Sequence, residues 1–190
     1  MRRIWVLCSV VFLPLPSLCL SAQSNGQRFD LQGTVWELEA RQCDQSPYLL
    51  YAIALKESKK LTGSETAAPS AFALNNPVFK GRIVNSYGEA REQLDRYLAA
   101  SSLTDVGIMQ VNVRWNGSRV ARPEQLLDVR TNVRVGAAVL CDAIKRHPGD
   151  IELAIGSYHT PNPAMEVQAR QYGRDVLRIW KRLILLKENP

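Results

Sequence analysis

Asp105-Val106-Gly107-Ile108-Met109-Gln110-Val111-Asn112 is the stretch of this 190-residue chain that most constrains its fold and its chemistry. The amides of Gln110 and Asn112 project from a segment that is otherwise apolar, and Gly107 permits backbone conformations that other residues resist. Such amides can hydrogen-bond the N-acetyl and hydroxyl groups of a sugar, while Met109 lies against its apolar face. An irregular core connection, with the amides capping nearby backbone, would produce the same pattern.

The residues on both sides of this stretch follow helical periodicity. Before it, helix-start signals predict helices that end near Cys43, Lys59 and Ser101; the signals are Thr34-Val35-Trp36-Glu37, Ser46-Pro47 and Ser86-Tyr87-Gly88-Glu89. After it, helix-start signals occur at Thr131, Asp150 and Asn162-Pro163. Residues 71–74 and 78–84 are predicted to form a short hairpin after a loop at 62–70. The predicted fold class is therefore all-α, mainly helical with a small β element.

Glu57 is the chemically unusual residue of the second predicted helix. It shares a face with Leu50, Ile53 and Ala54, which should point into the core. A carboxylate on such a face loses hydration, which raises its pKa, and a general acid must still be protonated near neutral pH. A helix that ends before Glu57 would instead leave this side chain in solvent.

A third candidate segment is Ala154-Ile155-Gly156-Ser157-Tyr158-His159, where small residues near a helix end lead to an aromatic hydroxyl and an imidazole. A tyrosine at position 158 can orient a carboxyl group or a substrate. Simple packing of Tyr158 would also account for its presence.

The N-terminus has the features of a secretory signal peptide, which we assign to residues 1–22, leaving a single domain at residues 23–190. Two arginines precede an apolar run that is too short for a membrane span, and Ser21-Ala22 offers a cleavage site. Lipid attachment at Cys19 would require a small residue before it, where Leu18 stands. We therefore expect a periplasmic protein with no stable membrane span after signal cleavage.

The charge of the chain is mildly positive, with a formal net charge of +6 that falls to +4 when the two arginines of the signal are removed. Nucleic acid is excluded as a partner because the basic residues are scattered and form no block. An acidic wall polymer or an anionic membrane surface suits this charge better. A solubilising surface charge accounts for it equally well.

Cys43 and Cys141 are the cysteines that remain after signal removal. In an oxidising compartment, two cysteines far apart in sequence predict one long-range disulfide. Two separate buried thiols are the alternative. The histidines of the chain are His147 and His159, and no Cys/His cluster surrounds either, so we do not expect a zinc site.

Four segments, taken in order along the chain, carry a specific resemblance. They are Glu57-Ser58, Gly107-Ile108-Met109-Gln110, Asn132-Val133 with Gly136 and Leu140, and Ala154-Ile155 with Tyr158. In this order they resemble the lytic transglycosylases of the soluble-lytic type, which have a lysozyme-like fold, and the resemblance spans residues 45–180. Those enzymes cut the MurNAc–GlcNAc β-1,4 bond of peptidoglycan glycan strands.

The resemblance implies a single-glutamate mechanism that needs neither a metal nor a cofactor. Glu57 protonates the leaving oxygen, the N-acetyl group of the substrate assists, and Glu57 then takes a proton from the 6-hydroxyl group, which closes a 1,6-anhydro ring. Tyr158 is implied to support the glutamate, and Tyr172 to be a further tyrosine of the glycan cleft. The other residues implied to line that cleft are Gly107, Met109 and Gln110.

The sequence departs from the general family pattern in two places. In both it resembles a subgroup encoded by conjugative elements and by transfer or secretion systems. His159-Thr160-Pro161 follows Tyr158 where the general family has Asn followed by Ala-Gly, and the stretch between Glu57 and Gly107 is long. Components of a transfer or secretion apparatus are therefore expected partners. Asn112 and His159 are expected to contact the substrate.

The predicted function is that of an exported lytic transglycosylase that opens the wall locally for such an apparatus. The nearest alternative is a hydrolytic muramidase, in which Asp105 would activate water as the second carboxylate. The alternative from another class is a non-catalytic assembly factor that binds glycan.

Overall fold

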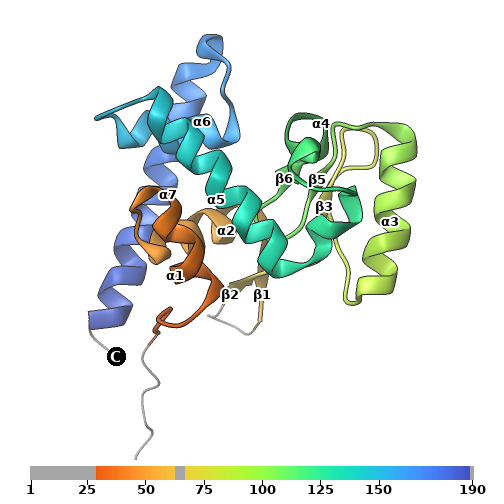
Figure 1. Cartoon of the computed structure of the whole chain (residues 1–190), viewed down its shortest axis with the longest axis horizontal. Coiled ribbons are helices and arrows are strands. Elements are labelled where there is room, and N and C mark those ends of the chain that lie inside the picture. Colours follow the sequence, from red (N-terminus) through yellow and green to blue (C-terminus); the bar gives the residue numbers. More distant parts are fainter. Residues whose placement is uncertain (1–28, 63–66, 189–190) are drawn as a thin grey trace, which may run out of the picture.

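The computed structural model describes residues 29–62 and 67–188, so the expected signal peptide lies outside the described residues. The described chain is mainly helical with a small β element, which confirms the predicted fold class. Figure 1 shows the four-stranded sheet and α3 (Tyr87–Ala100) on one side, and α1 (Val35–Ala40) and α7 (Glu166–Glu188) on the other. Helix α5 (Val129–Arg146) crosses between the two sides.

Helix α2 (Pro47–Ser58) is central to the core and packs against α1 and α7. Its apolar face behaves as the sequence predicts, since Leu50, Ile53 and Ala54 are at most 1 % exposed. Helix α6 (Ile151–His159) packs closely on α7, and a Cβ atom at Gly156 would overlap the Ala169 carbonyl group. Helix α7 therefore contacts both α6 and α2, the helix that carries Glu57.

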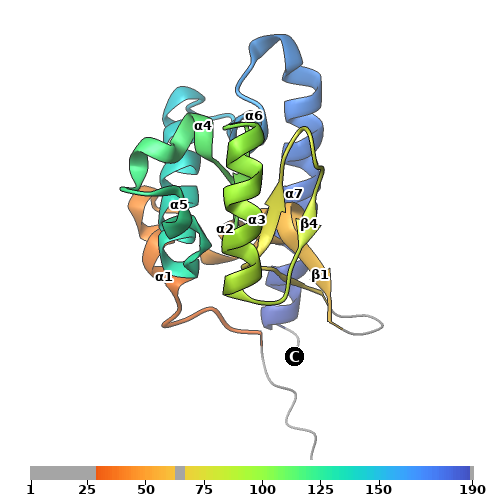
Figure 2. The same cartoon turned by 90° about the vertical axis from the view of Figure 1, so that its right-hand side faces the viewer.

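The four-stranded sheet is antiparallel throughout, with strand order β4-β3-β5-β6. Strands β3 (Ala73–Asn75) and β4 (Arg82–Ile83) form the predicted hairpin, and β5 (Asp105–Val106) pairs with β6 (Val111–Asn112) to form a second. In Figure 2, α3 lies beside the β3–β4 hairpin. The Tyr97 hydroxyl group donates to the Lys80 carbonyl oxygen, which fastens α3 to the hairpin loop.

A separate two-stranded sheet, β1 (Lys59–Leu61) with β2 (Ala67–Pro69), stands where the sequence predicts a helix end and a loop. Helix α2 stops at Ser58, and the backbone of Lys59 is already extended. The Ser58 hydroxyl group donates to the Ile108 carbonyl oxygen and accepts from the Ser70 amide. These tertiary contacts favour strand pairing immediately after the helix.

Three predicted helix caps are wrong in detail. The Ser46 hydroxyl group does not cap α2 but accepts from the Trp180 indole, while Pro47 begins the helix as predicted. Helix α5 begins earlier than predicted, because the Asp128 carboxylate accepts from the Thr131 amide and caps it. At α1, the Glu37 carboxylate accepts from Gly33, so the predicted capping box does not form.

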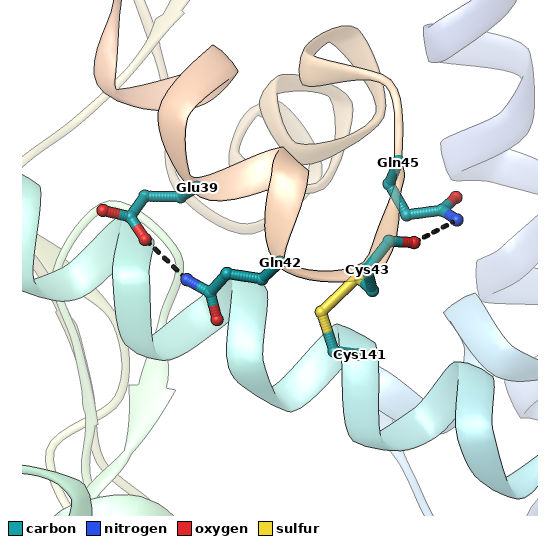
Figure 3. Close-up of a disulfide and its surroundings, with 5 residues drawn as sticks. All are labelled: Glu39, Gln42, Cys43, Gln45 and Cys141. Atoms are coloured by element: carbon teal, nitrogen blue, oxygen red, sulfur yellow. Dashed lines mark hydrogen bonds between the residues drawn. A yellow bond between two sulfur atoms is a disulfide. The ribbon is translucent and has the colours of Figure 1, made fainter.

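The predicted disulfide is confirmed. Cys43, in a short 3-10 turn after α1, is bonded to Cys141 in the middle of α5, across a sequence separation of 98 residues (Figure 3). The bond ties the N-terminal helices to the helix that crosses the molecule.

In the ranges 29–62 and 67–188, no helix is both long enough and apolar enough to cross a membrane.

Candidate active site

An open cleft of about 920 Å³ lies between the helices and the four-stranded sheet. Its lining comes from the end of α2, from all four strands of that sheet, from α4 (Val113–Asn116), and from α5 and α6. The volume is at the upper end of the range for ligand sites, about 300–1,000 Å³. Glu57 lies in the wall of this cleft.

Glu57 is the next-to-last residue of α2 and does not reach free into solvent, because its side chain is only 15 % exposed. Burial and the negative charge of Asp105 raise the pKa of this carboxyl, and the net result of all its interactions is a shift from 4.5 to about 7. A hydrogen bond from Tyr172 and the charge of Lys56 act in the opposite direction. The balance leaves a carboxylic acid that is half protonated near neutral pH, as the helix face predicts.

Tyr172 and His159 approach the same oxygen of this carboxyl group. The Tyr172 hydroxyl group donates to Glu57 Oε1 over 2.5 Å, and His159 Nδ1 lies 3.8 Å from Oε1. The two rings stack nearly parallel with their centroids 4.6 Å apart. Because both contacts are made to Oε1, Oε2 is the oxygen that is available to a substrate.

The two predicted tyrosines exchange their expected roles. Tyr158 lines the cleft, but its hydroxyl group donates to the Met109 carbonyl oxygen over 2.6 Å rather than to Glu57. Tyr172, expected in the cleft, is buried and supports the glutamate directly. Burial raises the pKa of both phenols, so both hydroxyl groups are hydrogen-bond donors at neutral pH.

Gly107 and Met109 do not line the cleft, but they help to position the turn that forms part of its wall. Met109 is fully buried, so its side chain cannot lie against a sugar ring as the sequence suggested; it packs against Gly136. Gly107 has a φ of +79°, and a Cβ atom there would overlap the Asn132 side chain. The Asn132 amide bonds three backbone groups around this turn, those of Val106, Met109 and Leu126.

Gln110 and Asn112 do lie in the cleft wall, and both also bind the protein itself. The Gln110 amide donates to the carbonyl oxygens of Ala73 and Gly107, so it braces the turn between β5 and β6. The Asn112 amide donates to Asp105 Oδ1, and its own Oδ1 is buried without a hydrogen-bond partner among the described residues. The two interpretations of this segment, sugar contact and backbone capping, are therefore compatible in one structure.

Several cleft residues had no recognisable sequence signal. The Trp115 side chain on α4 is 70 % exposed within the cleft, and three arginines line the same cleft: Arg82, Arg119 and Arg146. A single tryptophan or arginine between polar residues looks like ordinary surface, so only its position in the fold marks it.

Within the described chain, no three His, Cys, Asp or Glu side chains form a cluster that could hold a metal ion.

A mainly helical domain with a small sheet, an open cleft between them, and a buried carboxylic acid in the cleft wall is the arrangement of the lysozyme-like fold. The family described as the Transglycosylase SLT domain matches residues 34–175, and the chain belongs to this family. Its members are lytic transglycosylases that act on peptidoglycan. Comparison with curated proteins and with solved structures gave no match.

Proposed function

We propose that this protein is itself an active lytic transglycosylase, which cuts the MurNAc–GlcNAc β-1,4 bond and leaves a 1,6-anhydro-MurNAc end. The observation that carries the proposal is Glu57: a carboxyl in the cleft wall with a pKa of about 7, held at one oxygen by Tyr172. A group with this pKa can donate a proton and take one back at neutral pH.

In the first half of the reaction, Glu57 Oε2 donates its proton to the bridging oxygen of the glycosidic bond. The bond between that oxygen and C1 of MurNAc breaks, and the N-acetyl group of the same sugar stabilises the cation that develops at C1. The Tyr172 hydroxyl group stabilises the carboxylate that forms, since a hydrogen bond to a charged acceptor is stronger than one to a neutral acceptor.

In the second half, the Glu57 carboxylate takes the proton of the 6-hydroxyl group of MurNAc. The oxygen of that hydroxyl group attacks C1, which closes the 1,6-anhydro ring, and Glu57 regains its starting protonation state. No water enters the product. One carboxyl group therefore serves in both halves of the reaction.

A hydrolytic muramidase is favoured by one observation, because Asp105 lines the same cleft and its charge raises the pKa of Glu57. However, Asp105 accepts hydrogen bonds from the amides of Asn75 and Asn112, one on each oxygen. A carboxylate held in this way suits a structural role in the sheet better than the activation of a mobile water.

The test is digestion of purified sacculi, followed by mass spectrometry of the released fragments. Wild-type protein is expected to release fragments with 1,6-anhydro-MurNAc ends, whereas reducing MurNAc ends would show a hydrolase. Glu57→Gln should lower the rate by at least a factor of about 10²–10⁴, the usual contribution of general acid–base catalysis. A folded Glu57→Gln protein that digests sacculi at the wild-type rate would end the assignment of catalysis to this residue. A variant that no longer digests sacculi but keeps full biological activity would support the non-catalytic binding role.

We further propose that the protein is exported to the periplasm and opens the wall locally for a conjugation or secretion apparatus. The signal-like residues 1–22 and the Cys43–Cys141 bond support an oxidising compartment. The His159-Thr160-Pro161 departure supports the transfer-associated subgroup. Cell fractionation with N-terminal sequencing of the mature protein tests export, and co-purification with apparatus components tests the association.

A further inference from the structure

One stretch of the cleft wall carries an arrangement of charge and aromatic surface that the proposed reaction does not use. It is formed by Trp115 and Arg119, which lie on and just after α4, and by Asp142 and Arg146 on α5. We call these four residues the Trp115–Arg146 subsite. A 2.6 Å ion pair between Arg119 and Asp142 joins the two halves of the subsite.

This subsite has one positive charge in excess. Asp142 is already paired with Arg119, so its charge is neutralised locally. Arg146 follows Asp142 by one helical turn on the same face of α5, yet among the described residues no carboxylate lies within ion-pairing distance of it. A guanidinium group that faces a cleft without an internal partner presents a planar fork of donors, which fits a carboxylate.

The aromatic member of the subsite is Trp115. Its side chain is 70 % exposed, although a tryptophan of this size normally buries most of its surface. The Arg114 guanidinium lies over the ring, 5.3 Å from its centroid. The remaining exposed surface of the indole offers a flat apolar face with a polar edge, onto which a sugar ring can stack. The same part of the cleft therefore offers a surface for a sugar ring and a cation for a carboxylate.

Within a peptidoglycan strand, only one of the two sugars meets both requirements. GlcNAc carries no charge, whereas muramic acid carries a lactyl group with a carboxyl at its end. In strands without peptides this carboxylate is free; in peptide-bearing strands it is an amide, and the carboxylates lie further along the peptide.

We propose that the Trp115–Arg146 subsite binds a muramic acid residue of the strand, with the sugar ring on Trp115 and the carboxylate of its lactyl or peptide substituent on Arg146. The inference deepens the proposed function and rests on peptidoglycan being the substrate. It makes Arg146 a residue that selects carboxylate-bearing glycan over uncharged glycan.

The test measures binding in the Glu57→Gln background, so that the ligand is not consumed. Three oligosaccharides of equal length are compared by calorimetry: a GlcNAc oligomer, a GlcNAc–MurNAc oligomer without peptides, and the same oligomer with peptides. Arg146→Gln should weaken binding of a carboxylate-bearing oligomer by about 3- to 30-fold, and added salt should reduce the difference. Binding of the GlcNAc oligomer should not change.

The matched control is Arg134→Gln, which removes an exposed arginine from the same helix but outside the cleft, and which should affect none of the three ligands. Arg146→Lys keeps the charge without the planar fork, so it should restore part of the affinity. Circular dichroism confirms that each variant is folded. Trp115→Ala should weaken all three ligands, because each presents a sugar ring.

The pattern of losses identifies the source of the carboxylate. A loss with the peptide-free oligomer assigns Arg146 to the lactyl carboxylate, and a loss confined to the peptide-bearing oligomer assigns it to the peptide. Equal binding by the Arg146→Gln variant and its parent, or an equal loss for all three ligands, would overturn the subsite. A Glu57→Gln protein that still cleaves glycan would overturn the proposed catalytic role and leave the binding result intact.

Discussion

The burial of Glu57 affects both its proposed catalytic role and the stability of the protein, because the burial that raises its pKa also penalises its ionised form. The folded state binds this proton more tightly than the unfolded state does, with a pKa of about 7 against 4.5. The contribution of Glu57 to the free energy of unfolding is therefore most favourable below pH 4.5, and it is lost as the pH rises to about 7. At 1.36 kcal/mol per pKa unit, the full effect is about 3 kcal/mol.

Glu57→Gln should therefore stabilise the protein in a pH-dependent manner. The free energy of unfolding of the variant should match that of wild type near pH 4 and exceed it by about 3 kcal/mol above pH 7, since the amide has no charge to desolvate. Urea unfolding at several pH values measures the difference. Glu92→Gln, on the exposed side of α3, is the matched control and should show no such trend. A constant difference across the pH range would contradict the raised pKa.

Tyr172→Phe should change the pH dependence of the reaction in a defined direction. The Tyr172 hydrogen bond lowers the pKa of Glu57, so its removal should raise that pKa and keep the acid form present to higher pH. The alkaline limb of the kcat/KM profile should move up by roughly one pH unit, while the maximal rate falls because the carboxylate is less well stabilised.

Tyr158→Phe is the control for that experiment, because its hydroxyl group binds the Met109 carbonyl oxygen instead of Glu57. Its alkaline limb should stay at the wild-type position, whatever its effect on rate. If Tyr172→Phe also left the limb in place, another group would set the alkaline limb.

At the scale of elements, the β5–β6 hairpin is held by side chains that come from outside it. The Asn132 amide on α5 and the Tyr158 hydroxyl group on α6 both bond its turn, and the Ser58 hydroxyl group on α2 bonds the Ile108 carbonyl oxygen. The turn next to the Glu57 carboxyl is thus positioned by three helices. This explains why the Asn132 and Tyr158 positions accompany the Gly-Ile-Met-Gln motif.

Gln110→Ala should destabilise the protein as well as weaken glycan processing. Its amide donates to the carbonyl oxygens of Ala73 and Gly107, and the truncation leaves both without this donor. We expect a loss of about 1–2 kcal/mol in the free energy of unfolding, measured by urea titration, together with lower activity on sacculi. Unchanged stability would show that water replaces the amide without cost and that Gln110 acts on the substrate alone.

At the scale of the whole molecule, the Cys43–Cys141 bond is the long-range covalent constraint. It closes a loop across a sequence separation of 98 residues, for which the chain-entropy model gives a stabilisation of about 4–5 kcal/mol. Reduction should lower the melting temperature by roughly 10 °C. Calorimetry with and without reductant measures the shift, and Cys43→Ser with Cys141→Ser should reproduce it. Free-thiol labelling of both cysteines in the native protein would contradict the bond.

Much of this architecture could be predicted from local sequence. Helical periodicity marked the apolar face that carries Glu57, and it depends only on residues three or four positions apart. The β3–β4 hairpin and the α6 cap at Asp150 follow from equally local signals. The disulfide could be predicted because removal of the expected signal peptide would leave two cysteines, and two cysteines allow a single pairing.

The partners of the Glu57 carboxyl could not be predicted in this way. Tyr158 and Tyr172 are both aromatic residues on helical faces near the site, and the packing of α7 against α2 determines that Tyr172 reaches Glu57. From the sequence, Met109 is likewise predicted to be a cleft residue, but its contact with Gly136 places it in the core. The Trp115–Arg146 subsite is likewise formed by residues from separate elements, α4 with the turn after it and α5. Such contacts depend on the distances between elements, which no local pattern of residues encodes.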